Sequence, residues 1–438
     1  MSLAAALLLG ANLYAIDNVK VNGDAKLYYG TSDNDVTNKT PGLEVPDMFD
    51  KDVSYADAGI DLGITADLTE GVSAGVSMQA VSTLGLENNL VSGVWSGAHD
   101  VTTGNGASFD PLNTNGVQVD DAAWVSEAWI AGTAYDTTAK IGRMTLDTPL
   151  AFTETWSIST NTFEGAVLLN QSIEDTTLVG AWIGKSNGIG DDTAALNLGN
   201  VVSVEGKFNT FAKNGAYAVG AINNSWKPLT AQAWYYNLEG LANAYWVQAD
   251  LDMEGILAGA QVVGIDANDN VSPVDNADKD AAFGLMLGYA MKDVVTVKVA
   301  YSKVDDDGTL GVGNVATRGA GSGSQSKLYT EMWWWYGTVS QTGAESWAVT
   351  AEATPFWDVD LFLGYYYSEI DANQIAGVPV VGNDTNEVSE IAFTASRSFG
   401  PLDASVAILY DDFDQDAPKG ANYLESQTNL QVYLTYNF

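Results

Sequence analysis

Histidine is the side chain that most often carries acid–base chemistry, and this sequence has only one, His99. His99 lies in the stretch Ser96-Gly97-Ala98-His99-Asp100, and the sequence has no cysteine. A hydrolase that needs histidine beside a carboxylate or a serine would depend on this residue alone. We expect His99 on a mobile loop, where its imidazole is a poor general base. The protein is therefore predicted not to be an enzyme, and a hydrolase is the least favoured alternative.

Carboxylates are the commonest chemical groups in the chain. There are 56 Asp and Glu against 18 Lys and Arg, which gives a formal net charge of −38, and the three arginines are Arg143, Arg318 and Arg397. Such a surplus attracts cations and repels anions, and no nucleic-acid partner is expected.

Two acidic segments offer the oxygen ligands that Ca²⁺ prefers. One is Asp305-Asp306-Asp307, and the other is residues 266–280. Neither has the full spacing of an EF-hand loop, since Val271 stands where that loop needs glycine. Solvated surface charge is the favoured interpretation, with Ca²⁺ bound at Asp305, Asp306 and Asp307 as the alternative. No other cofactor is expected.

Many other charges alternate with apolar residues, as they do when a strand has one wet and one apolar face. Between residues 19 and 27, for example, apolar side chains fill one face, while Asp24 and Lys26 share the other. Charges in hydrocarbon would cost several kcal/mol each, so the charged face must be wet. The charges predicted to line this wet face are Asp24, Lys26, Asp57, Asp61, Asp67, Asp250, Asp252 and Lys298.

The last ten residues show the same alternation. Leu430, Val432, Leu434, Tyr436 and Phe438 share one face, and polar residues and Tyr433 occupy the other. An apolar face that ends in aromatic residues is typical of a strand that crosses an outer membrane. An edge strand of a soluble sandwich has the same pattern, so this segment alone leaves both possibilities open.

Composition favours the membrane barrel. No apolar window of about 18 residues exists beyond the extreme N-terminus, which excludes a bundle of membrane-spanning helices. Residues 3–11 are apolar and Leu13-Tyr14-Ala15 is similar to a cleavage site, so residues 1–15 are predicted to be a signal peptide, although no Lys or Arg precedes the apolar run. Residues 16–438 are then a single domain.

Eighteen strands can be counted from residue 18 to residue 438. Short turns, such as 69–71 and 292–294, alternate with long polar segments, such as 85–121 and 305–345. Outer-membrane barrels have this rhythm of short periplasmic turns and long outer loops. We therefore predict an all-β protein, an antiparallel up-and-down transmembrane barrel of about 18 strands, with 16 as the alternative. An interior that wide is a channel, and its acids predict moderate cation preference.

One segment identifies a family. The run Ile141-Gly142-Arg143-Met144-Thr145-Leu146-Asp147-Thr148-Pro149-Leu150, followed by Ser159-Thr160-Asn161-Thr162-Phe163-Glu164-Gly165, resembles the third-loop region of the Opr-type porins of epsilonproteobacteria, relatives of the OprD-like and Campylobacter major outer membrane porins. Phrases such as residues 178–184 and 231–236 are similar as well.

The resemblance implies an 18-stranded outer-membrane porin that assembles as a homotrimer and whose third loop (about 144–162) folds inward as the constriction. Arg143 matches the arginine of the family motif and is expected to oppose Asp147, Glu154 or Glu164 across the opening, or else to neutralise a neighbouring carboxylate. OprD-like porins select carboxylated solutes with a run of arginines. Three arginines cannot build such a run, which puts selectivity for organic anions in doubt.

Partners and alternatives follow from the same interpretation. We expect outer-membrane lipid, lipopolysaccharide, cations and small hydrophilic solutes as partners, with divalent ions bridging acidic loops. The aromatic run from Met332 to Tyr336 is a loop anchor or a subunit contact, with sugar stacking as the alternative. A structural or adhesin barrel with a closed lumen is the second function that the sequence allows.

Overall fold

The computed structural model describes residues 16–36, 45–94, 97–103, 117–188, 201–268, 279–306, 308, 310–317, 324–355, 357–371, 385–414 and 424–438. The predicted signal peptide, residues 1–15, lies outside these residues. Among the residues described, no helix has the length and apolar character that crossing a membrane would require.

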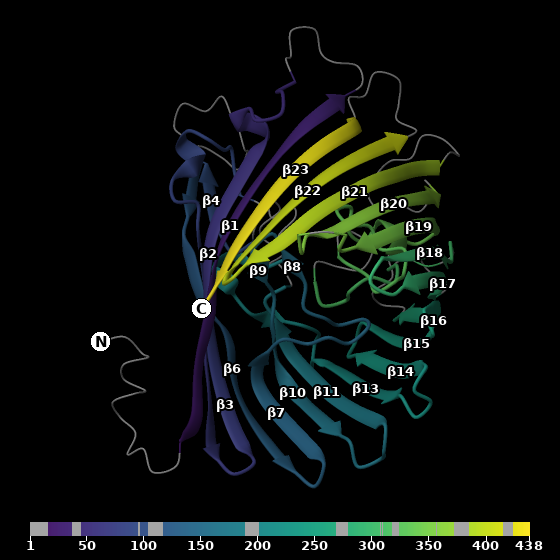
Figure 1. Cartoon of the computed structure of the whole chain (residues 1–438). Coiled ribbons are helices and arrows are strands. Elements are labelled where there is room, and N and C mark those ends of the chain that lie inside the picture. The colour runs from purple at the N-terminus through teal and green to yellow at the C-terminus, as the bar shows by residue number, and fades with distance from the viewer. Residues whose placement is uncertain are drawn as a thin grey trace.

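Strands of alternating apolar and polar residues form one antiparallel sheet that closes on itself (Figure 1). Eighteen of them make the wall. In chain order these are β1 (Asp17–Val36), β2 (Ser54–Thr69), β3 (Val72–Ser82), β6 (Ala122–Ala134), β7 (Thr137–Met144), β10 (Phe163–Asn170), β11 (Thr176–Ser186), β13 (Ala216–Asn223), β14 (Leu229–Leu238), β15 (Ala242–Met253), β16 (Ile256–Ala267), β17 (Asp280–Met291), β18 (Val295–Val304), β19 (Ala344–Ala353), β20 (Asp360–Asp371), β21 (Thr385–Phe399), β22 (Leu402–Asp414) and β23 (Leu424–Asn437).

The barrel closes where β1 pairs with β23. Leu27 lies opposite Leu434 and Tyr28 lies opposite Tyr433, so apolar and polar faces match across the seam. Two hydrogen bonds of 2.9 Å between the backbones of Gly23 and Phe438 complete it. The predicted fold class, the count of 18 strands and the outer-membrane barrel are confirmed.

The remaining elements belong to the long connections. They are the strands β4 (Asp100–Thr103), β5 (Val117–Asp120), β8 (Thr155–Trp156), β9 (Ser159–Thr160) and β12 (Asn209–Thr210), and the 3₁₀ turns η1 (Lys51–Val53), η2 (Leu86–Asn88), η3 (Val204–Gly206) and η4 (Thr338–Ser340). In Figure 1, β8 and β9 lie within the ring of strands. These connections build the interior.

Parity along each strand separates the outer from the inner face. Ile60, Leu62, Val297 and Val299 are exposed on the outside, as lipid-facing residues must be. Residues of the opposite parity on the same strands point inward: Gly59 lies against Ile158 of the β7–β10 connection, and Ser302 bonds to Thr330 of the β18–β19 connection. Apolar side chains thus face lipid, and polar side chains face the interior.

Candidate functional site: two loops that cross the barrel

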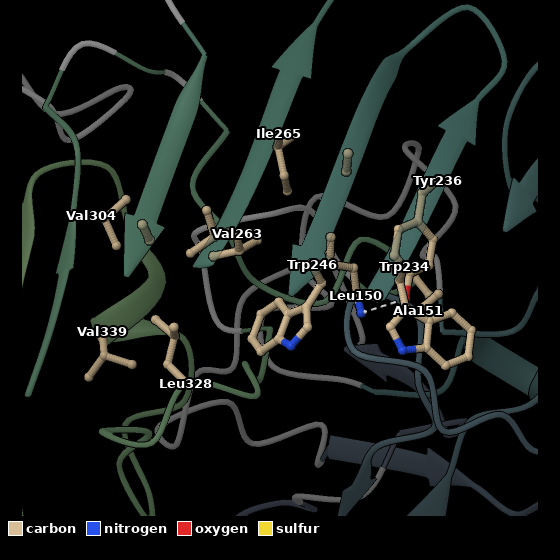
Figure 2. Packing of buried hydrophobic residues seen from close by; sticks show 14 of the residues in the cluster. Leu150, Ala151, Trp234, Tyr236, Trp246, Val263, Ile265, Val304, Leu328 and Val339 are labelled. Carbon is tan, nitrogen blue, oxygen red and sulfur yellow. Dashed lines mark hydrogen bonds between the residues drawn. The ribbon is translucent and has the colours of Figure 1, made fainter. Parts of the chain in front are cut away.

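The β7–β10 connection, residues 145–162, enters the barrel and packs on the inner wall of β14. Leu150 and Ala151 are buried against Trp234 and Tyr236, and the backbone N–H of Leu150 donates to the hydroxyl of Tyr236 at 3.4 Å (Figure 2). On the opposite side, the backbone N–H of Thr160 reaches Gln79 of β3 at 3.5 Å. This connection, the third loop, therefore spans the interior.

A second connection, residues 305–343 between β18 and β19, also folds inward; we call it the β18–β19 loop. Its Leu328 and Val339 are buried near Trp246, Val263 and Val304 of the inner wall (Figure 2). The loop also contacts the third loop directly, because the backbone N–H of Val315 donates to the carbonyl of Leu150 at 2.9 Å. The sequence predicted residues 305–345 only as a long outer segment. We refer to the two loops together as the partition.

Glu154 joins the two loops of the partition. It is 1% exposed, and its carboxylate accepts hydrogen bonds from the amide of Asn314 (2.7 Å), the hydroxyl of Thr317 (2.6 Å), the backbone N–H of Gln325 (3.1 Å) and the indole N–H of Trp156 (2.8 Å). Burial raises the pKa of Glu154, and these donors partly oppose the shift. Glu154 thus connects the third loop to the β18–β19 loop through buried hydrogen bonds.

Glu390 of β21 anchors the aromatic run of the β18–β19 loop. Its buried carboxylate accepts the backbone N–H groups of Trp333 (2.7 Å), Trp334 (2.9 Å) and Trp335 (3.0 Å). The ring of Trp335 packs edge-on against Phe413 of β22, with centroids 4.7 Å apart. The aromatic run is therefore a loop anchor on the inner wall. Sequence reasoning missed Glu390, although its position on the polar face of β21 was a usable signal.

Glu331 lies within the same loop and supports its turn. It accepts the backbone N–H of Gly337 at 2.8 Å and pairs with the hydroxyl of Ser326. Burial raises the pKa of Glu331 to about 8, and the charge of Glu154 adds to the rise. The carboxyl of Glu331 is accordingly mostly protonated at pH 7.

Arg143 and Glu164 lie on the outer face of the wall. Arg143 lies two residues from Ile141, which is 57% exposed among the lipid-facing residues, and it faces Glu164 directly across the β7–β10 ladder. Its Nε donates to Glu164 at 2.9 Å, and Lys185 approaches the same carboxylate at 3.6 Å. The resemblance implied that Arg143 and Glu164 belong to the constriction, whereas the strand alternation here turns both outward and pairs them with each other.

Asp147, the fourth residue of the predicted constriction, faces the interior from the third loop. Its partner is Lys327 of the β18–β19 loop, with Nζ 2.9 Å from the carboxylate oxygen. Lys327 was not among the residues singled out in the sequence. The opposed charges that were expected from Arg143 are therefore supplied by a lysine from another loop.

The other predicted lumen charges lie on strand faces that point inward or at strand ends. Lys26 pairs with Asp61 and with Asp24 (3.2 Å), and Lys298 pairs with Glu352 at 3.3 Å. Asp250 accepts the hydroxyl of Tyr329 at 2.5 Å, and Asp67 accepts the amide of Asn18 at 2.6 Å. Asp252 is exposed near the end of β15. A further pair, Lys140 with Glu127 at 3.9 Å, was not anticipated.

His99 is not the freely moving side chain that the sequence suggested. It is 1% exposed, with Nε2 2.8 Å from the carboxylate of Asp57 and Nδ1 2.9 Å from the carbonyl oxygen of Asp120. Burial opposes a charge on the ring, but the hydrogen bond and attraction of Asp57 outweigh it and raise the pKa of His99. The imidazole thus fastens the β3–β6 connection to the inner wall.

The predicted calcium residues fall partly outside the described structure. Asp305 and Asp306 follow β18, whereas Asp307 lies outside the described residues. Within the described part of the chain, no group of three or more His, Cys, Asp or Glu side chains is arranged to hold a metal ion.

We expect Arg143→Gln to leave ion selectivity unchanged, because the guanidinium lies on the outer face of the wall. Lys140→Gln, which removes a cation from the inner face of the same strand, should increase cation preference. Both effects are read from the reversal potential of the purified protein in a planar bilayer under a salt gradient. A large shift for Arg143→Gln would place that residue in the ion path.

A closed barrel with an apolar outer face, a polar interior and loops folded across it defines a β-barrel channel protein of the outer membrane. The sequence matches a family model described as "outer membrane porin, OprD family" over residues 17–352. The chain belongs to the OprD family of outer membrane porins. Members of this family are porins and not enzymes.

Solved structures share this fold. They include Acinetobacter baumannii OccAB1 (14% identity, TM-score 0.68, covering 98% of each chain) and Pseudomonas aeruginosa OccK3, also called OpdO (12% identity, TM-score 0.66, covering 98% of this chain and 99% of that one). P. aeruginosa OccK2 (OpdF), solved in complex with glucuronate, has 12% identity, a TM-score of 0.65 and coverage of 96% and 99%. No curated protein matches the sequence significantly.

Proposed function

We propose that this protein is a cation-preferring porin for passive diffusion of ions and small hydrophilic solutes, with the third loop, about residues 144–162, forming part of the constriction. The observation that carries the proposal is the partition: the third loop and the β18–β19 loop cross the interior and bond to each other through Glu154. A solute that moves through the barrel must pass this partition, which therefore sets size and charge selection.

Charge on the inner face supports cation preference. Four inward lysines of the described wall and partition, Lys26, Lys140, Lys298 and Lys327, each lie within 4.0 Å of at least one carboxylate. Asp250 faces the same interior without a lysine or arginine within 4.0 Å among the described residues. Carboxylates in surplus within low-dielectric walls concentrate cations and exclude anions. Glu331, mostly protonated at pH 7, adds little to this surplus.

The test is single-channel recording in a planar bilayer. We expect stepwise current and, under a KCl gradient, a reversal potential that indicates moderate preference for K⁺ over Cl⁻. Uncharged polyethylene glycols of graded size would set the size limit of the passage. Anion preference would contradict the proposal on charge, and complete absence of current would favour a structural or adhesin barrel.

Lipopolysaccharide is the proposed partner of the outer rim. Arg143 and Lys185 lie on the outward face around Glu164, and Lys303 pairs with Glu345 at 3.0 Å on the outward face of β18 and β19. Such cations suit phosphate groups, and divalent ions could bridge the acidic loops, including Asp305, Asp306 and Asp307, to the same groups.

A homotrimer is the proposed assembly. Its support on the molecule is an apolar concavity on the outward face of β7, β10 and β11, where Ala139, Ala166 and Gly180 lie among Ile141 and Trp182. Small residues allow close approach of two walls within a membrane. The mass of the detergent-solubilised protein, determined by light scattering, decides between monomer and trimer. The relation to epsilonproteobacterial porins is likewise proposed from the similar sequence phrases alone.

A further inference from the structure

Lys327 is held in the middle of the barrel by contacts with β16 and β15. The carbonyl of Lys327 accepts the amide of Gln261 at 2.8 Å, and the oxygen of the same amide accepts the backbone N–H of Tyr329 at 3.2 Å. The hydroxyl of Tyr329 donates to Asp250 at 2.5 Å. Gln261 lies midway along β16 and is 2% exposed, so the backbone around Lys327 is fixed to the wall.

The side chain of Lys327 reaches from this wall to the third loop. Its ammonium lies 2.9 Å from Asp147 and 4.5 Å from the centre of the Phe152 ring, which is buried. The side chains of Lys327 and Asp147 are 41% and 84% exposed, unlike the buried contacts of Glu154 and Glu390. The pair therefore meets water inside the barrel, where permeating ions also meet it.

We infer that Lys327 is the cation that determines charge specificity at the partition, and that permeating anions exchange with Asp147 for its ammonium. A pair this exposed is weak, so a permeating anion such as Cl⁻ can displace Asp147 transiently. An ammonium or metal cation can displace Lys327 from Asp147 in the same way. The pair thus gives the constriction one site for each sign of charge.

This inference rests on the proposed porin function and adds a residue to it. Lys26 and Lys298 pair with carboxylates borne by neighbouring strands. Lys327 instead joins two loops from opposite sides of the barrel, 180 residues apart in sequence. Its ammonium is consequently part of the partition and not only of the wall.

Two substitutions that break the same pair should have opposite effects. Lys327→Gln leaves Asp147 alone and should raise the ratio of K⁺ to Cl⁻ permeability by about twofold or more, whereas Asp147→Asn frees the ammonium and should lower it by a similar factor. Permeability ratios come from reversal potentials in a planar bilayer under a KCl gradient. A purely structural role would move both variants in the same direction, because both lose the same ion pair.

The matched control is the outward pair Lys303 and Glu345, with the same kind of contact at 3.0 Å. Lys303→Gln and Glu345→Gln should leave the permeability ratio unchanged. Lys327→Arg keeps the charge and should stay near the parent value, and heat-modifiable electrophoretic mobility confirms that each variant folds. Equal or unchanged ratios for Lys327→Gln and Asp147→Asn in a conducting protein would overturn the inference alone. A parent protein without current would instead contradict the porin function.

Discussion

Glu390→Ala should widen the passage and raise single-channel conductance about twofold or more, because this one carboxylate holds the backbone of three consecutive residues. Each of these hydrogen bonds contributes about 0.5–1.5 kcal/mol, and the contribution is larger when the acceptor is ionised. Asp411 lies directly opposite Glu390 on β22, and both side chains are 0% exposed, so two acids share one buried site. The three backbone N–H donors of the loop lower the free-energy cost of burying these two acids. In return, their hydrogen bonds to Glu390 hold the loop against the wall.

Single-channel conductance and the size limit for polyethylene glycols measure this effect. Glu387→Ala is the matched control, because Glu387 lies on the same strand three residues earlier, with the parity of the lipid-facing Ile391 and Phe393. Glu387→Ala should conduct like the parent. Unchanged conductance and size limit in folded Glu390→Ala would mean that other contacts hold the aromatic run in place.

Raising the pH from 6 to 9 should loosen the β18–β19 loop, because the pKa of Glu331 is raised by burial to about 8. A carboxyl with a raised pKa binds its proton more firmly in the packed loop than in the open one. Its stabilising effect is full below the ordinary value of 4.5 and is lost as the pH rises toward and through about 8. Between pH 6 and pH 9 the loss is about 3 kcal/mol.

Open-channel current noise and mean conductance at pH 6 and pH 9 report this loosening. Both should rise at pH 9 in the parent protein, and Glu331→Gln should reduce the rise, because the amide stays neutral and can still accept the N–H of Gly337. Any pH dependence that remains in Glu331→Gln comes from other titratable groups, among them His99, whose pKa is also raised. An equal rise in Glu331→Gln would exclude Glu331 as its cause.

The alternation of apolar and polar residues was enough to predict most of the fold. The period of two assigned inward and outward faces along strands such as residues 18–29 and 295–304, and the matching faces of β1 and β23 closed the barrel. This worked because one face must meet hydrocarbon and the other water, a difference that every strand must satisfy.

The interior was harder to predict, because loops have no period. The inward course of the β18–β19 loop depends on Glu390, which lies more than fifty residues away in sequence. The aromatic run from Trp333 to Trp335 was the available signal, since so much apolar surface needs a partner. Arg143 was assigned from a family motif, which identifies the segment but not the face on which each residue lies. His99 was predicted to be mobile because its partner, Asp57 of β2, lies 42 residues away in the sequence, and nothing in the sequence pairs the two.

The contact between Gly23 and Phe438 also bears on how the chain reaches its native state. The first and last strands are neighbours, so closure joins segments separated by almost the whole sequence, and its entropic cost grows with that separation. Until it forms, β1 and β23 each present an unpaired edge of N–H and C=O groups, which is a template for aggregation in water and is intolerable in lipid. An unclosed intermediate must therefore be kept shielded, and a substitution that weakens this seam should reduce the yield of assembled protein before it alters the channel.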